Sequence, residues 1–402
     1  MSEWKKVKLK DICSKIIDCV NKTAPVCDYE TPYKMLRTSD IRNGQINTEG
    51  LKCVTKETFE KWNRRGYLQK GDVIFTREAP VGEVGWLKDP KNLFLGQRLM
   101  FFRTDNNKCD NRFLFYSLSF SDNKRNIIAM SNGSTVNHLR VPDCENIEIS
   151  IPDLPIQHRI ATILSRYDSL IENYQKQIKL LEEAAQRLYK EWFVDLHFPG
   201  HENTKIVDGV PEGWEKKPVN TIIELQSGYA FKSSEFSEDG LYKIVTIKNV
   251  KDGAFDGENV SKIASIPEKM PKHCILEDGD ILLSLTGNVG RVCIVTGKNY
   301  LLNQRVAKLK STSKAYTYCL FRSRDMFIEV NNLANGAAQQ NVSPIKIGEM
   351  NILIPKDKLL NEFEKTSSNY ILGIIAFQTQ IRILTEARDR LLPKLMSGEI
   401  KV

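Results

Sequence analysis

The sequence predicts an α/β protein in which two mixed α/β globular domains are separated by a long antiparallel two-helix coiled coil, with a pseudo-two-fold internal repeat. Between Ile160 and Trp192, apolar residues recur at alternating steps of four and three, which is the a/d pattern of a coiled coil. The register returns from Phe363 to Leu395, so the chain supplies its own partner helix. The two seams consist of Ile160, Leu164, Tyr167, Ile171, Tyr174, Ile178, Leu181, Ala185, Leu188 and Trp192, and of Phe363, Ser367, Tyr370, Ile374, Phe377, Ile381, Leu384, Arg388, Leu391 and Leu395.

The globular halves repeat as well. Gly71–Phe75 (GDVIF) returns as Gly279–Leu283 (GDILL), and the pair Gln97-Arg98 returns as Gln304-Arg305. A repeat of roughly 200 residues is too long for a solenoid. It indicates that a whole module, a globular domain followed by a long helix, has been duplicated.

The duplication gives the domain boundaries. We expect a first globular domain at 1–152, a first long helix at 153–197, a second globular domain at 198–355, and a second long helix with the C-terminal tail at 356–402. The segment 198–213 is rich in Pro and Gly, which is typical of a boundary between domains.

Within each globular half, short β-branched or aromatic runs lie between Gly, Asn and Asp turns. They predict strands at 73–76, 99–103, 281–285, 291–295 and 307–310, and strand-like endings at 147–152 and 350–355. A helix is expected near 112–120, with its counterpart near 316–330.

Each long helix begins just after its own globular half. If the helices pair antiparallel, the halves lie at opposite ends of a rod. A parallel pair would require the linker 198–213 to return along a helix of roughly 50 Å, which an extended chain could just achieve. The antiparallel arrangement is therefore preferred.

Composition excludes several classes of protein. The formal charge of +8 and the pI near 8.8 only weakly favour an acidic partner. The nine cysteines include no C-x-x-C, so we expect reduced thiols. Because the start lacks the apolar core of a signal peptide and no apolar run approaches the ~20 residues that span a bilayer, we expect a soluble, intracellular protein.

Catalytic signatures are missing. The sequence contains no phosphate-cradling loop, no glycine-rich cofactor loop opening a helix and no methyltransferase motif of the Asn-Pro-Pro-Tyr kind. Pro142-Asp143 and Pro152-Asp153 are not followed soon by an acidic-x-Lys strand, which argues against a nuclease. His197 and His201 have no obvious third ligand, so no metal site is expected.

Several motifs together resemble the specificity (S) subunit of type I restriction–modification systems. They are the strand-to-helix junction Ile151–Ile160 (IPDLPIQHRI), its weaker copy at Ile354-Pro355-Lys356, the closing segment Arg390–Ile400, and the Gly-Asp-Val/Ile-Ile/Leu motif at 71 and 279. The second junction departs from the first, with Leu359-Leu360-Asn361 in place of Ile156-Gln157-His158, and its seam carries Ser367 and Arg388.

The resemblance implies two target-recognition domains, each reading one half of a bipartite double-stranded DNA site, with the helices as spacer. It also implies assembly with two copies of a methyltransferase (modification) subunit and with restriction subunits. S-adenosylmethionine would bind the methyltransferase subunit, and this chain would be a non-catalytic, cytoplasmic protein that binds no cofactor. Two alternatives are a coiled-coil adaptor whose globular halves bind protein, and a stand-alone DNA modification enzyme.

Loops that differ between the two halves are the best candidates for reading bases, whereas the recurring Gln-Arg pairs favour a shared structural or phosphate-contacting role. Arginine, asparagine and glutamine can make bidentate contacts to base edges, and lysines would contact phosphates. The DNA-binding candidates are Lys34, Arg37, Ser39, Arg77, Arg98, Asn137, His138, Lys232, Lys248, Asn249, Thr286, Asn288, Arg291, Arg305, Gln339, Gln340 and Asn341.

Overall fold

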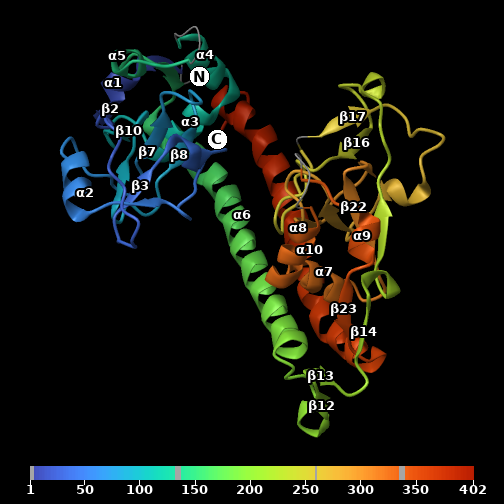
Figure 1. Ribbon diagram of the computed structural model, residues 1–402. Helices are drawn as coiled ribbons and strands as arrows, with labels where there is room; N and C mark the ends of the chain where they lie inside the picture. Colours follow the sequence, from blue (N-terminus) through green and yellow to red (C-terminus); the bar gives the residue numbers. More distant parts are fainter. Residues whose placement is uncertain (1–3, 132–136, 259, 335–339) are drawn as a thin grey trace. The chain divides into compact units, whose positions relative to one another are not determined.

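The computed structural model describes residues 4–131, 137–258, 260–334 and 340–402 (Figure 1). They form two units, which are described separately: unit 1 comprises Met1–Leu170 with Leu384–Val402, and unit 2 comprises Ile171–Ile383. Both unit boundaries fall inside a long helix rather than in the segment 198–213. Each unit therefore contains part of both long helices, packed against its own globular part.

Unit 1 contains an antiparallel sheet of order β2-β10-β7-β8 and a smaller sheet of order β6-β3-β9, in which β3 and β9 run parallel. The first strand, β1, pairs with the last, β11. The elements are β1 Lys5–Lys8, α1 Leu9–Ile12, β2 Cys13–Asp18, β3 Lys34–Leu36, β4 Ile41–Arg42, β5 Gln45–Ile46, β6 Lys52–Cys53, α2 Lys56–Trp62, β7 Val73–Thr76, β8 Val84–Trp86, β9 Leu93–Leu95, β10 Leu99–Thr104, α3 Asn111–Ser119, α4 Ser121–Ala129, α5 Val141–Glu145 and β11 Glu148–Ile151.

Unit 2 repeats this topology. Its antiparallel sheet has the order β15-β22-β19-β20, its smaller sheet has the order β17-β16-β21-β18 with β16 and β21 parallel, and β14 pairs with β23. The elements are β12 Ile206–Val207, β13 Val210–Pro211, β14 Glu215–Pro218, β15 Glu224–Ser227, β16 Tyr242–Val245, β17 Ser261–Ile263, β18 Ile275–Leu276, β19 Ile281–Ser284, β20 Val292–Ile294, β21 Tyr300–Leu302, β22 Val306–Lys310, α7 Lys314–Arg322, α8 Arg324–Ala334, α9 Pro344–Gly348 and β23 Asn351–Ile354. The predicted internal repeat and mixed α/β class are confirmed.

The central strands have apolar residues on both faces because both faces are covered. In β7, Val73 and Phe75 belong to one hydrophobic core and Ile74 belongs to another. In β10, Met100 and Phe102 join the first core. Side chains alternate between the faces of a strand, and a strand buried on both faces is apolar throughout. The strands β19 and β22 of unit 2 divide between two cores in the same way.

The two long helices are α6, Leu154–Tyr189, which continues through a π-helical turn at Lys190–Val194, and α10, Asp357–Met396. Within unit 1, Ile160 and Leu164 share a core with Leu395. Within unit 2, the ring of Tyr174 stacks on that of Phe377 with centroids 5.1 Å apart. Residues further along α6 thus contact residues earlier in α10, so the two helices are antiparallel. Every predicted seam position is buried or half-buried.

The two polar seam residues behave differently. In unit 1, Arg388 Nη1 lies 2.9 Å from Asp168 Oδ1, so its charge is paired across the seam. In unit 2, Ser367 is fully buried and its hydroxyl has no hydrogen-bond partner among the described residues. The arginine is therefore accommodated by a carboxylate on the facing helix, whereas the serine hydroxyl is desolvated without compensation.

Buried acids on α6 tie that helix to each globular part. In unit 1 the Tyr116 hydroxyl on α3 donates to Asp168. In unit 2 the Tyr318 hydroxyl on α7 donates to Glu182 Oε1 at 2.5 Å, and Arg322 lies 3.5 Å from the same carboxylate. Burial raises the pKa of Glu182.

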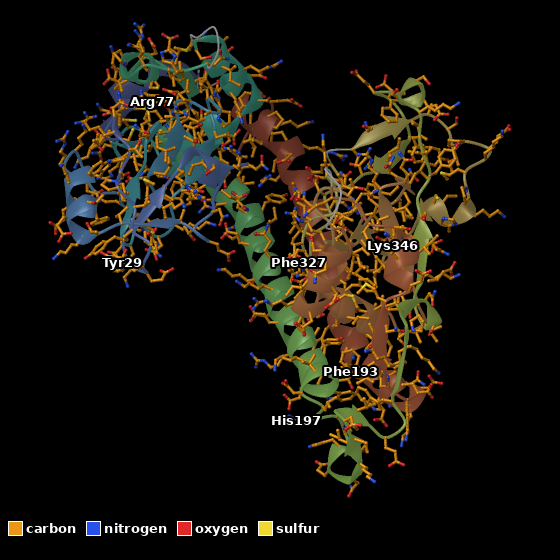
Figure 2. The ribbon with its side chains drawn as sticks, in the orientation of Figure 1. Tyr29, Arg77, Phe193, His197, Phe327 and Lys346 are labelled. Carbon is orange, nitrogen blue, oxygen red and sulfur yellow. The ribbon has the colours of Figure 1, made fainter. Side chains whose placement is uncertain are left out.

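One expectation needs correction. The single helix expected near 316–330 is wrong, because α7 and α8 are separated at Ser323, which is extended and accepts a hydrogen bond from Met326 N at the start of α8. The segment 198–213 contains the β12–β13 hairpin, and its first residue, Phe198, packs with Trp214 and Leu359 in a small core of unit 2. Figure 2 shows Phe193 and His197 at the C-terminal end of α6, where this segment begins.

Candidate nucleic-acid interface

In unit 1 the loop after β7, the loop before β10 and the segment before α5 meet in one place, which we call loop cluster 1 (residues 76–83, 96–98 and 137–140). The backbone holds them together. Arg77 N donates to Arg98 O at 2.8 Å, and Leu139 N donates to Arg77 O at 3.0 Å. Glu78 and His138 form an isolated antiparallel bridge. Figure 2 labels Arg77, the residue that joins all three segments.

Unit 2 builds the same frame in loop cluster 2 (residues 284–290, 303–305 and 340–342). Leu285 N donates to Arg305 O at 3.0 Å, and Val342 N donates to Leu285 O at 3.0 Å. Thr286 and Asn341 form the matching antiparallel bridge. The two clusters therefore place Glu78 opposite His138 and Thr286 opposite Asn341 on equivalent backbones.

The recurring Val-Gly pairs shape these loops. Gly82 and Gly290 both have left-handed backbones, with φ of +84° and +86°, which an L side chain rarely adopts. Their amides donate to Thr76 O at 2.9 Å and to Ser284 O at 3.0 Å. The repeat of these glycines is thus explained by a shared turn.

Side chains on the shared frame differ. In loop cluster 1, Arg98 Nε lies 3.0 Å from Glu78 Oε2, with the two side chains 52% and 28% exposed. In loop cluster 2 the Thr286 hydroxyl donates to Asn341 Oδ1 at 2.8 Å. No ion pair involves Arg305 within the described parts of unit 2. The same scaffold therefore presents an acid–base pair in one unit and a hydroxyl–amide pair in the other.

A surface pocket of about 330 Å³ opens in loop cluster 2. Among its lining residues Thr286 is buried, whereas Gln304, Arg305 and Asn341 are exposed. The lining residues are Leu285, Thr286, Gln304, Arg305, Asn341, Val342, Ser343 and Pro344. The exposed amides of Gln304 and Asn341 give this concave surface donors and acceptors suited to the edges of bases.

The structure brings several candidates together in the clusters. Arg77, Arg98 and His138 meet in loop cluster 1, where Arg77 Nη1 also donates to Leu139 O at 3.2 Å. Asn137 is exposed beside them. The candidates Thr286, Asn288, Arg305, Gln340 and Asn341 belong to loop cluster 2, with Arg291 half-buried at the edge of its turn. Gln339 lies outside the described residues.

The remaining candidates of unit 1 lie on β3 and the turn after it. Lys34 Nζ is 2.7 Å from Glu30 Oε2, and Arg37 makes two hydrogen bonds to Asp40, at 3.0 and 2.8 Å. Ser39 is exposed in the same turn. Both cations are therefore partly neutralised by neighbouring carboxylates.

Asn249 does not fit its place among the DNA-binding candidates. It is fully buried, and Oδ1 accepts from Thr246 N at 2.8 Å while Nδ2 donates to Asp256 O at 2.9 Å. It closes the turn that Asp40 closes in unit 1 by accepting from Arg37 N at 2.8 Å. The amide is satisfied inside the protein and faces no solvent in this conformation. Its neighbour Lys248 and the more distant Lys232 are exposed.

Sequence reasoning missed Glu78. It stands in a loop that differs between the two halves, but the sequence around it does not indicate a role distinct from that of its neighbours. Its contact with Arg98 depends on the closure of two loops. The replacement of this acid by threonine in the second half was the only signal in the sequence.

The described part of the chain contains no helix that is long and apolar enough to cross a membrane. Among curated proteins, the chain is 26% identical to the type I restriction enzyme MjaIX specificity subunit of Methanocaldococcus jannaschii, covering 100% of this chain and 94% of that protein. It is 28% identical to the MjaVIII specificity subunit of the same organism, covering 100% and 93%. The HindI specificity subunit of Haemophilus influenzae is 21% identical, with full coverage of both chains.

Among solved structures, the S subunit of a type I restriction–modification system from M. genitalium matches with a TM-score of 0.59 at 17% identity, over 98% of this chain and 96% of that one. This likeness supports the fold. The family model for the type I restriction modification DNA specificity domain matches twice, at residues 1–183 and 211–365, and the chain belongs to that family.

Proposed function

We propose that this chain is the sequence-reading subunit of a type I restriction–modification complex, and that each loop cluster reads one half of a bipartite DNA target. The single observation that carries the proposal is the duplicated backbone frame with different side chains. A shared frame presents the same shape to each half of a duplex. Different side chains on it provide different hydrogen-bonding patterns, and base edges in the major groove are distinguished by such patterns.

Charges around the frame support a division of labour. Phosphate contacts position a protein on DNA, and base-edge contacts specify the sequence. The exposed cations Lys232, Lys248 and Arg305 suit the first role. The facing pairs Glu78–His138 and Thr286–Asn341 suit the second, because they differ between equivalent positions.

The long helices would set the distance between the half-sites. Each is a single element, of 36 residues for α6 and 40 residues for α10, and together they form an antiparallel seam within each unit. A pseudo-two-fold repeat offers similar surfaces twice and so suits two copies of one partner. We therefore expect two methyltransferase subunits to dock on this chain, with restriction subunits joining for cleavage.

On this proposal the chain itself is non-catalytic and acts on DNA in the cytoplasm. S-adenosylmethionine would be bound by the methyltransferase subunit. The support is the family, together with relatives that are named specificity subunits. An experiment must exclude two alternative functions: an adaptor without DNA specificity, and a modification enzyme that acts without a partner subunit.

The test uses the purified chain alone and reconstituted with its cognate methyltransferase subunit. Each preparation is incubated with a DNA library and labelled S-adenosylmethionine, and methylated DNA is sequenced. We expect methylation only from the reconstituted complex, at a split site with two defined halves, and DNA binding that weakens steeply with salt. Methyl transfer by the chain alone, or methylation by the complex without sequence preference, would refute the proposal.

A further inference from the structure

The recurring Gln-Arg pairs occupy equivalent positions, yet the two arginines differ in conformation. Arg98 has a left-handed backbone with φ of +71°, and Ala79, next to its partner Glu78, has φ of +48°. Arg305 is not among the described residues with positive φ. Non-glycine residues adopt this region at a cost, and they concentrate at functional sites. One of these residues is Arg98 itself and the other, Ala79, is next to Glu78, so both lie at the Glu78–Arg98 contact.

The electrostatic settings also differ. Glu78 Oε2 contacts Nε of Arg98, on the inner edge of the guanidinium. Neither terminal nitrogen of Arg98 has a hydrogen bond to the described residues, and the side chain is about half exposed. Arg305 is exposed without an acid partner in the described parts of unit 2. At the position of Glu78, unit 2 has Thr286, whose hydroxyl bonds to Asn341 instead.

These settings suit different contacts. A guanidinium paired with a carboxylate at Nε keeps its terminal donors available on the opposite edge, which suits the paired acceptors O6 and N7 of guanine. The same carboxylate is poorly placed beside a phosphate, because it reduces the positive charge and repels the anion. An unpaired, exposed arginine keeps its full charge for a phosphate.

We propose that Glu78 is a positioning residue that orients Arg98 to recognise a guanine in the half-site bound by unit 1, and that Arg305 contacts a DNA phosphate. This inference rests on the proposed function and adds to it the base type and the residues responsible. It also separates two arginines that sequence repetition assigned to one shared role.

The experiment measures base preference at every position of the target, using the reconstituted complex with the methyltransferase subunit and DNA libraries randomised at each half-site. Exchange of residues 1–152 assigns one half-site to unit 1. Arg98→Lys keeps the positive charge but removes the paired N–H donors of the guanidinium. Glu78→Gln removes the carboxylate charge at nearly constant shape. Arg305→Lys and Arg305→Ala respectively keep and remove the charge at the equivalent position of unit 2.

One guanine position in the half-site of unit 1 should lose preference by about 5- to 150-fold in Arg98→Lys. Glu78→Gln should lower preference at that same position by a smaller factor, and the half-site of unit 2 should be unchanged. Arg305→Ala should weaken binding to all DNA sequences about equally, and it should reduce the slope of log affinity against log salt by about 0.9. Arg305→Lys should restore both the affinity and the slope.

The matched control is Asp122→Asn, which removes one carboxylate from an exposed arginine ion pair elsewhere in unit 1. It should leave every base preference unchanged. The inference is overturned if Glu78→Gln behaves like this control, if preference falls equally at all positions of the half-site, or if Arg98 and Arg305 variants behave alike. A parent complex that selects no half-sites would instead refute the proposed function, and this inference with it.

Discussion

Replacing Arg388 by alanine should destabilise unit 1, because it leaves a carboxylate on the coiled-coil seam without its closest cation. Asp168 is only 15% exposed and Arg388 26%, with 2.9 Å between Nη1 and Oδ1. At an effective dielectric constant of 20 the gross attraction is roughly 6 kcal/mol, most of which is offset by desolvation. Arg112, 3.9 Å from Asp168, gives partial compensation. We expect a coupling energy of about 1–3 kcal/mol between Asp168 and Arg388.

The assay is hydrogen exchange with mass spectrometry at increasing urea, on the parent, Arg388→Ala, Asp168→Asn and the double variant. Peptides from 111–119 and 154–170 report unit 1, and peptides from unit 2 serve as an internal control. The exposed pair Lys56–Glu60, 65% and 56% exposed at 3.9 Å, is the matched control, with a coupling of about 0.5 kcal/mol or less. A coupling at Asp168–Arg388 no larger than this control would refute the reasoning.

Three further predictions concern the helices. Ser367→Ala should leave the chain equally stable or stabilise it by about 1 kcal/mol in urea unfolding, because it removes a buried hydroxyl without a partner; a loss above this size would contradict the assignment. Burial raises the pKa of Glu182, so its contribution to stability is complete below the unfolded pKa and is lost as pH rises through the folded pKa. The stability of the parent relative to Glu182→Gln should therefore fall as pH rises above about 4.3, the ordinary pKa of a glutamate, and a difference that stays flat or grows would exclude this. One heptad added to both α6 and α10 should lengthen the preferred spacer by about three base pairs, as measured by selection from randomised spacers, and an unchanged spacer in an active variant would show that the helices do not set it.

Much of the fold could be predicted because its signals are periodic and local. The four-three seam from Ile160 to Trp192 requires one helix face, and nothing in the sequence between these residues interrupts it. Val73, Ile74 and Phe75 of the buried strand Val73–Thr76 are apolar because two cores cover the strand. The local pattern did not predict the break between α7 and α8. The side chain of Ser323 caps α8 and so divides a segment whose composition is helical throughout.

The candidate site was only partly predictable. Differences between aligned loops pointed to residues that the structure gathers on one frame, because duplication preserved the backbone while the side chains diverged. The same reasoning could not distinguish Asn249, whose amide folds back onto its own turn, from an exposed loop residue. Nor could it find Glu78, since its contact with Arg98 forms only when two loops separated by β8 and β9 close on each other.

The most direct test of the two-reader account exchanges residues 1–152 for the equivalent domain of a relative with a different target. The hybrid chain is reconstituted with the methyltransferase subunit, and its methylated sites are mapped by sequencing. We predict that one half-site changes to that of the relative while the other half-site keeps the parent sequence. A hybrid that remains active but changes both half-sites, or neither, would contradict the claim that each unit reads its own half.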